Sequence, residues 1–423
     1  MQSVMSHQFG QIPKAEIQRS QFDRSHGYKT TFDAGYLIPV FIDEALPGDT
    51  MNLKMNAFAR LATPLKPFMD NLVLDSFFFA VPYRLVWNNF NKFMGEQVNP
   101  GDSTSYTVPY TTAPGAGGIV VGSLSDYMGL PTGINSIQFN VLWHRGYNLI
   151  WNAFFRDENL QNSIAEQHGD GPDTYTDYTL QKRGKRKDYF TGCVPWPQKG
   201  SDVSIPLGTT APVFGNGKSL GFSNGDSTMA LSTAGTSGTI LSTNLYNVNV
   251  GTAYSAGVPG NSKAMGIVTS GESGLIANLS TATAATINAL RSAFQLQRLY
   301  ERDARGGTRY TEIVKSHFGV TSPDARLQRP EYLGGGSSMV NIHPVQQTAT
   351  GATPLGNLAG FGTVSIQGHG FTKSFTEHTL LIGMVSVRAD LTYQQGMNRM
   401  LSLIHISEPT RRTPISYAVF CLK

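Results

Sequence analysis

Side chains that could carry catalysis or hold a metal are scattered along this sequence rather than grouped. None of its nine histidines lies four residues from another, and no CxxC pair is present, so the spacings typical of zinc sites are absent. His369 and His378 are the closest pair with strand-like sequence around them, and a solvated or core position is the better interpretation of each. Cys193 has no base near it in the sequence, which favours a packed thiol over a nucleophile.

Glycine-rich stretches are equally unspecific. The Gly334–Gly336 run does not continue into a phosphate-binding signature, and it predicts a turn. We therefore expect no catalytic residue, no cofactor, no metal site and no enzymatic activity.

One compact group of cations is more suggestive. Such a run, followed by the aromatic pair Tyr189 and Phe190, can contact phosphates, with an affinity that falls steeply as salt rises. Contact with nucleic acid and contact with another subunit are both open interpretations. A second basic set between Arg298 and Lys315 is diluted by acidic residues, which favours an ion-paired face. The basic run consists of Lys182, Arg183, Lys185, Arg186 and Lys187.

The composition points to a loop-rich β protein. Charged residues make up 15% of the 423-residue chain, against about 25% in typical globular domains. Glycine (45) and proline (22) are abundant, and the net charge of +4 is small for a protein that binds nucleic acid through its charge alone. The sequence contains two cysteines and no apolar run of membrane-spanning length. We expect a soluble protein that is made inside the cell and does not insert into membranes.

Elements predicted from the hydrophobic pattern begin with three strands separated by turns. Residues 51–61 alternate apolar and polar side chains, residues 72–81 are rich in β-forming aromatics, and Pro39 places the strand over 36–42 at a sheet edge or puts the proline at a strand start. This order favours an antiparallel, mainly β fold. Helices are predicted over 84–94, 147–159 and 284–304, and further strands over 339–345, 362–367 and 380–387.

Residues 201–285 form a segment of different composition. It is dominated by Gly, Ser, Thr, Ala and Asn and holds only five charged residues. Short apolar runs recur in it, so an inserted loop domain ordered by neighbouring subunits and a flexible linker both remain open.

Several strings resemble the major capsid proteins of the Microviridae, especially their gokushovirus branch. They include SHFGVTSPDARLQRPEYLGG (316–335), FDAGYLIPVFIDEALPGDT (32–50), DSFFFAVPYRLVW (75–87), KRKDYFTGCVPWPQKG (185–200) and VRADLTYQQGMNRM (387–400). They occur in family order over roughly residues 1–400. The signature segment, 317–331, contributes His317, Phe318, Gly319, Pro323, Asp324, Arg326, Gln328, Arg329, Pro330 and Glu331.

The resemblance implies an eight-stranded antiparallel jelly roll of the viral capsid type, with long helical and loop insertions. It implies an extended arm over 1–35, the jelly roll over 36–200 and 286–400, and a protrusion at the threefold axes over 201–285. Copies would assemble in the cytoplasm of a bacterial host into a T=1 icosahedral virion around circular single-stranded DNA.

The implied partners are further copies of the chain, the packaged DNA, a small basic DNA-binding protein, an internal scaffolding protein, a pilot protein and a host surface receptor. The insertion would contribute to host attachment. The alternative is a jelly-roll glycan-binding or attachment protein, which would stop at small oligomers.

The sequence departs from the family pattern after Met400. Residues 401–423 resemble a translated sequencing adapter, and we interpret them as a non-native tail. Without the tail the net charge is +2, because its three cations outnumber its one carboxylate by two. The last strand or strands of the barrel are then missing, and we expect exposed strand edges, poor solubility and no authentic capsids from the chain as written.

Overall fold

The computed structural model describes residues 17–64, 68–103, 105–188, 192, 194–204, 286–348, 350–351 and 354–392, with seven short strands between 213 and 277. The chain divides into two compact units, one formed by residues 1–193 with 308–423 and the other by residues 194–307.

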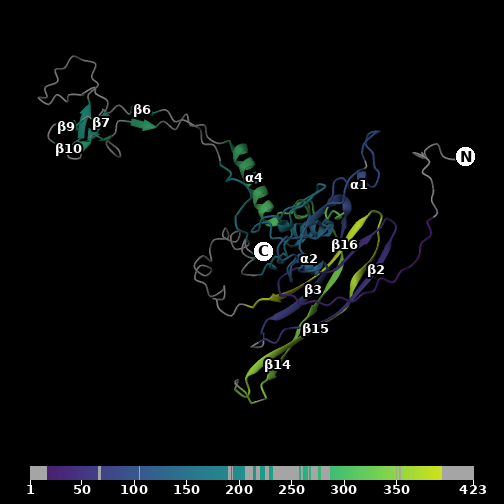
Figure 1. Ribbon diagram of the computed structural model, residues 1–423. Helices are drawn as coiled ribbons and strands as arrows, with labels where there is room; N and C mark the ends of the chain where they lie inside the picture. Colours follow the sequence, from purple (N-terminus) through teal and green to yellow (C-terminus); the bar gives the residue numbers. More distant parts are fainter. Residues whose placement is uncertain are drawn as a thin grey trace, which may run out of the picture. The chain divides into compact units, whose positions relative to one another are not determined.

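A four-stranded antiparallel sheet is the centre of the first unit (Figure 1). Its last strand lies between the first and the third, and Ile382 pairs with Phe79 on one side and with Ile42 on the other. The predicted strands over 72–81 and 380–387 are confirmed, and the strand that carries Pro39 is an edge strand, as expected. The order is β1 (Ile38–Ala45), β16 (Thr379–Asp390), β3 (Asn71–Pro82) and β13 (Glu331–Met339).

A three-stranded antiparallel sheet faces this one, in the order β14 (Asn341–Gln346), β15 (Leu358–Ser374) and β2 (Thr50–Arg60). Exposure alternates along the whole of β2, as its sequence predicts, because successive side chains point to opposite faces of a strand. Its inward residues pack against Val364 and Phe371 of β15 and against the first sheet.

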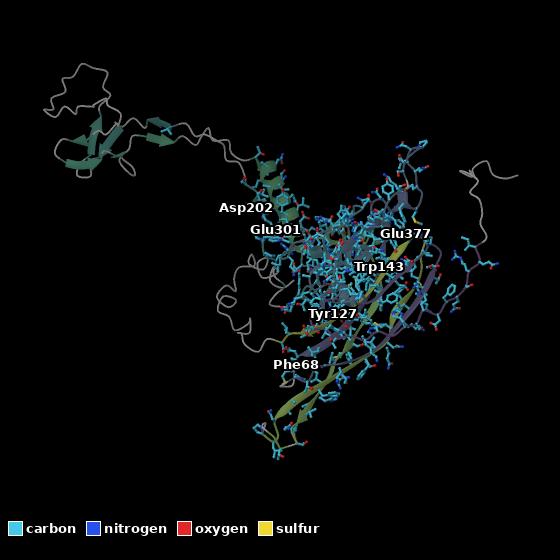
Figure 2. The ribbon with its side chains drawn as sticks, in the orientation of Figure 1. Phe68, Tyr127, Trp143, Asp202, Glu301 and Glu377 are labelled. Carbon is cyan, nitrogen blue, oxygen red and sulfur yellow. The ribbon has the colours of Figure 1, made fainter. Side chains whose placement is uncertain are left out.

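Helices and loops cover the other face of the four-stranded sheet. Leu142, Tyr147 and Ile150 pack against Phe79 and Leu380 there, so β16 is buried on both faces over most of its length. Side chains crowd this layer around Tyr127 and Trp143 (Figure 2). The layer contains η1 (Tyr83–Leu85), α1 (Phe90–Phe93), β4 (Tyr110–Thr112), α2 (Leu124–Tyr127), β5 (Gln138–Asn140), α3 (Leu142–Ile150), the π-helical turn η2 (Trp151–Phe155) and η3 (Tyr175–Asp177).

Two predicted helices are wrong in extent. The helix expected over 147–159 begins at Leu142 and ends at Phe155, because the backbone of Arg156 is extended. Gly146 allows this helix to lie close to β16, since a Cβ there would come within 3.0 Å of Ile382. The helix expected over 84–94 is only two short turns, Tyr83–Leu85 and Phe90–Phe93, with non-helical residues 86–89 between them.

The turn predicted at Gly334–Gly336 is also wrong, because these glycines lie inside β13. A Cβ at Gly334 would come within 2.6 Å of the backbone oxygen of Gly370, and one at Gly336 within 2.6 Å of the His369 ring. The glycines therefore allow β13 to approach β15 of the facing sheet closely, which is a common reason for glycine within a strand.

The described part of the N-terminal arm, residues 17–33, has no regular secondary structure and is exposed except at Phe32, which packs against the core. Arg24 pairs with Asp43 at 2.8 Å, and the His26 ring stacks on Phe41 with centroids 6.1 Å apart. Tyr28 donates a hydrogen bond to the backbone of Tyr127 at 3.0 Å. The arm thus runs beside the outer edge of β1, held by side chains rather than by a strand ladder.

The second unit contains a helix, α4 (Ile287–Gly306), close to the predicted 284–304. The hydroxyl of Thr286 accepts a hydrogen bond from the backbone of Ala289 at 3.1 Å and caps its start. The short strands of this unit pair antiparallel, and most of the predicted 201–285 insertion lies outside the described residues. They are β6 (Val213–Gly215), β7 (Leu220–Ser223), β8 (Thr228–Leu231), β9 (Gly257–Val258), β10 (Asn261–Ala264), β11 (Gly266–Ile267) and β12 (Leu275–Ala277).

The two large sheets hold seven described strands, so the predicted count of eight stays a prediction. That the last strand or strands of the barrel are missing also stays a prediction. Residues 401–423, interpreted above as a non-native tail, lie outside the described residues.

Candidate functional site

The basic run lies against the body of the first unit. Lys182 forms an isolated antiparallel bridge with Tyr36, and the Arg183 backbone donates to the carbonyl of Gly35 at 2.8 Å. The indole of Trp151 donates to the carbonyl of Lys182, also at 2.8 Å. These backbone contacts hold the first half of the run in place independently of what its side chains bind.

The five cations of the run have different surroundings. The Lys182 ammonium lies 5.1 Å from the Tyr36 ring centroid, and Lys185 pairs with Asp188 at 2.7 Å. Arg183 is half-buried within the unit, whereas Arg186 and Lys187 are exposed. A contact with DNA or with another subunit therefore falls to the exposed members, and that role stays a prediction.

Asp75 is the partner of Arg183 and the centre of a polar cluster that the sequence did not indicate. Its side chain, 4% exposed, pairs with Arg183 and with Arg388 at 2.8 Å, and accepts a hydrogen bond from Ser337. Burial alone would raise the pKa of Asp75, but hydrogen bonds from Ser337, Arg183 and Arg388 outweigh it and lower the pKa. The cluster joins β3, β13, β16 and the basic run.

A second buried polar centre lies on α3. Arg145 binds both carboxylate oxygens of Asp173, at 2.6 and 2.7 Å, and donates to the carbonyls of Val86 and Gly169. Tyr178 also donates to Asp173, and burial together with this carboxylate raises the tyrosine pKa. A buried charge pair of this kind holds the loop that carries Asp173 against the helix.

Next to it, His144 is enclosed among Ser125, Phe139 and Tyr178. Its Nε2 lies 3.0 Å from the Ser125 hydroxyl, and the two aromatic rings lie 5.1 and 5.5 Å away. Burial lowers the pKa of His144 to about 3, so the imidazole is neutral at physiological pH. This is a core histidine rather than a proton donor at a surface.

The signature segment connects helix α5 (Tyr310–Phe318) to β13. Gly319 ends the helix in the left-handed conformation, with φ of 71°, which favours glycine. Asp324 and Arg329 form an ion pair at 2.8 Å, and the Arg329 guanidinium lies 4.3 Å from the Phe154 ring centroid. These contacts fold the connection back onto the helical layer.

The end of the segment is bound to the loop between β15 and β16. Arg84 donates to Gln328 and pairs at 2.7 Å with Glu377 (Figure 2). Glu331 pairs with Lys373 of β15. Pro330 is buried; His317 is half-buried; Phe318, Gly319, Pro323 and Arg326 are exposed.

Part of the second basic set, between Arg298 and Lys315, is ion-paired, as the favoured interpretation predicted. Arg305 pairs with Glu301 at 3.1 Å within α4. Arg309 pairs with Glu158 and with Glu312, at 3.4 Å for the latter, in the first unit. Neither arginine is a free cation.

No described residues form a group of three or more metal ligands. His369 and His378 contact different partners, since His369 lies 2.9 Å from the Ser76 hydroxyl and His378 packs on Phe90. Cys193 lies outside the described residues. No helix in the described part of the chain is long and apolar enough to cross a membrane.

The sequence also contains the pattern Gly-x-Ser-x-Gly, at 217–221 and 221–225. Ser223 of the second copy lies in β7, paired with Thr228 of β8 in an antiparallel ladder. A nucleophilic serine of this motif instead lies at a sharp turn from strand to helix. Ser223 therefore lies in a strand of the second unit and not at the turn that a nucleophilic serine of this motif occupies.

Comparison with known proteins gives one consistent result. The family described as capsid protein (F protein) matches residues 10–405. Capsid protein VP1 of Bdellovibrio phage phiMH2K is 48% identical over 94% of this chain and 74% of its own length. Capsid protein VP1 of Chlamydia phage 1 is 40% identical over 95% of the chain and 76% of its own length, and that of Spiroplasma virus 4 is 35% identical over 92% and 73%.

Proposed function

Because the chain belongs to the phage capsid protein (F protein) family, it is a structural subunit of a phage virion, and we propose that its copies close into a T=1 icosahedral shell around circular single-stranded DNA. The family match over almost the whole chain is the observation that carries this proposal. A closed shell requires contacts between unlike surfaces whose rotations close, and the exposed arm over 17–33 offers one such surface.

The topology supports a jelly roll. Successive large strands alternate between the two facing sheets at the start of the chain, and β16 returns between β1 and β3. Wrapping of this kind is typical of capsid jelly rolls. The helical layer and the second unit are then the long insertions between strands.

The second unit is proposed as the protrusion at the threefold axes, with host attachment as its further role. Its long helix exposes apolar side chains, with Phe294 61% exposed and Ile287 68%. A segment that is covered by symmetry-related copies would show this pattern, because its core is completed only in the shell.

Further partners follow from the same assignment. The small net charge of +4 leaves most of the DNA charge to other molecules, which supports a separate small basic protein within the particle. An internal scaffolding protein, a pilot protein and a host receptor complete the proposed set.

Assembly is the test of the shell. The source DNA is resequenced across the codons for Met400 and Leu401, and the chain with the recovered reading frame is purified. We expect closed particles by electron microscopy, with the mass that T=1 symmetry requires. If the chain stops at small oligomers and binds glycans instead, the attachment-protein alternative replaces the capsid shell.

A further inference from the structure

The outer face of the three-stranded sheet is bare in the described part of the chain. The inward side chains of β2, such as Met55 and Ala57, pack against the facing sheet, while the outward ones are exposed along its full length. The opposite side of the sandwich is covered by the helical layer. The first unit therefore has one covered face and one bare face (Figure 1).

The bare face lacks carboxylates. No Asp or Glu occurs in residues 50–69 or 340–376, which contain β2, β14 and β15. With 29 acidic residues in 423, stretches of this combined length would carry about four at the average frequency of the chain. Soluble surfaces usually intersperse both signs of charge, so an ordinary solvated face does not account for this composition.

Cations and aromatic rings take the place of acids on this face. Lys54, Phe58 and Arg60 all point outward from β2, and Phe58 is 74% exposed. Arg60 lies opposite Thr363 of β15, and Phe361, 41% exposed, lies opposite His343 of β14. Neither Lys54 nor Arg60 has an ion-pair partner among the described residues.

Hydrogen-bonding side chains fill the rest of the face. Thr50 lies 2.7 Å from Ser374, and Thr372 donates to Asn52 at 3.2 Å. Exposed aromatic rings on which bases can stack, set among cations that meet phosphates, are the combination by which proteins bind single-stranded nucleic acid without reading its sequence.

A second copy of the chain fits this face less well. In a twofold contact the same patch occurs on both sides, so Lys54 and Arg60 would approach the cations of the partner with no carboxylate between them. A contact with an unlike surface of a second copy is separated by the oligomeric-state measurement described below. Subunit interfaces are also depleted in lysine at their cores. Protection of an edge strand explains Lys54, but it does not explain an exposed phenylalanine two residues from an arginine.

We infer that the bare face, defined by Lys54, Phe58, Arg60, His343 and Phe361, binds the packaged single-stranded DNA and faces the inside of the shell. The inference rests on the proposed capsid function and adds the surface that meets the DNA. It moves that contact away from the basic run, since Arg183 joins the cluster of Asp75, whose neighbours on β3, Phe77 and Phe79, point into the helical layer.

The experiment measures binding of a fluorescent oligothymidylate to the unassembled chain with its recovered reading frame at several salt concentrations. The variant Lys54→Gln/Arg60→Gln removes two cations from the bare face, and Lys29→Gln/Arg326→Gln removes two exposed cations elsewhere on the first unit as a matched control. Each phosphate contact on a single strand contributes about 0.7 to the slope of log K against log salt. We expect the first variant to reduce the slope by about 1.4 and the control to leave it unchanged.

The aromatic part of the face is tested with Phe58→Ala. Loss of one stacked base should weaken binding about tenfold while the salt slope stays the same, since no cation is removed. Circular dichroism and thermal midpoints check that all three variants fold as the unaltered chain does.

The outcomes separate this inference from the capsid proposal. An unchanged slope in the Lys54→Gln/Arg60→Gln variant, or an equal reduction in the control, overturns the inference even if electron microscopy shows normal shells. A changed oligomeric state of folded Lys54→Gln/Arg60→Gln protein with unchanged DNA binding would make the face a subunit contact, which also overturns it. Absence of shells from the unaltered chain with its recovered reading frame counts against the capsid function, whatever the DNA measurements show.

Discussion

Buried ionisable side chains hold the long connections of this chain onto its sheets. Asp75 joins the basic run to three strands, and Asp173 joins a loop to α3 through Arg145. Burial of a charge is costly unless it is paired and hydrogen-bonded, and each of these carboxylates has several donors. The pairs fix which segments lie together more than they add net stability.

His144 makes the stability of the fold sensitive to mild acid. Its pKa is lowered from 6.5 to about 3 by burial, so the unfolded chain binds a proton more readily than the folded one. The contribution is complete above about pH 6.5 and is lost as the pH falls, by up to about 1.4 kcal/mol per pH unit.

The variant His144→Gln tests this directly, because glutamine keeps a polar group but does not titrate. Urea unfolding between pH 7 and pH 5 should show a shallower loss of stability for the variant than for the unaltered chain. Parallel pH dependences would show that His144 is accessible to protons in the folded state.

The Asp75 cluster should affect the free energy of unfolding at a lower pH than His144 does. Asp75→Asn removes the charge that Arg183 and Arg388 share, and we expect a loss of about 1.5–3 kcal/mol at pH 7, the range for hydrogen bonds to charged groups. Because the folded pKa is lowered, this contribution is present above about pH 4, the usual Asp range, and declines below it. Unfolding free energies of the two proteins should therefore converge as the pH falls below 4, and a constant difference would contradict the role of the charge.

At the scale of elements, close packing between the two sheets depends on glycines within strands. Gly334 and Gly336 bring β13 against Gly370 and His369 of β15, and the His369 ring is held 2.9 Å from the Ser76 hydroxyl. The spacing of the sheets is therefore set at a few residues that carry no side chain.

Gly336→Ala should destabilise the fold by about 1–3 kcal/mol, the usual cost of overpacking a close contact. The added methyl group would lie about 2.6 Å from the His369 ring. Gly27→Ala is the control, since nothing lies within 4 Å of a Cβ at that exposed position. The thermal unfolding midpoints of the two variants are compared. Equal midpoints would show that the sheets can move apart to accept the methyl group without loss of stability.

At the scale of the whole molecule, the two units are built differently. The first has a core of its own between two sheets and a helical layer. The helix of the second exposes Leu290, Phe294 and Leu299, whereas a helix that packs within its own subunit buries its apolar face. The first unit thus has a core of its own, whereas the helix of the second leaves apolar side chains exposed among the described residues.

Leu290→Ser/Phe294→Ser tests whether α4 is covered on assembly. Each apolar side chain buried in the shell would contribute about 1.5–3 kcal/mol, so we expect the concentration needed for assembly to rise at least tenfold. The thermal midpoint of the unassembled subunit should stay unchanged, because these side chains are already exposed there. Gln295→Ser on the same helix is the control, and normal assembly of both variants would leave α4 outside the subunit contacts.

Strands with a local hydrophobic pattern could be predicted from the amino-acid sequence. Alternation over 51–61, the aromatic run over 72–81 and the apolar run over 380–387 each predicted a strand that the structure contains. The signature segment likewise identified the family before any geometry was known. These predictions succeed because a half-buried strand and a long family motif both depend on residues that are adjacent in the sequence.

Features that depend on contacts between distant segments became visible only in the folded chain. Gly334–Gly336 looked like a turn because only the facing strand requires glycines there. The basic run looked uniform, yet its members differ because Asp75, more than a hundred positions earlier, binds Arg183. The bare face could not be recognised in one segment, since β2 lies beside β15 only after some three hundred residues of intervening chain have folded. Contacts between residues distant in sequence are fixed by packing in the folded chain. The hydrophobic pattern of a short segment carries no information about which distant segment will pack against it.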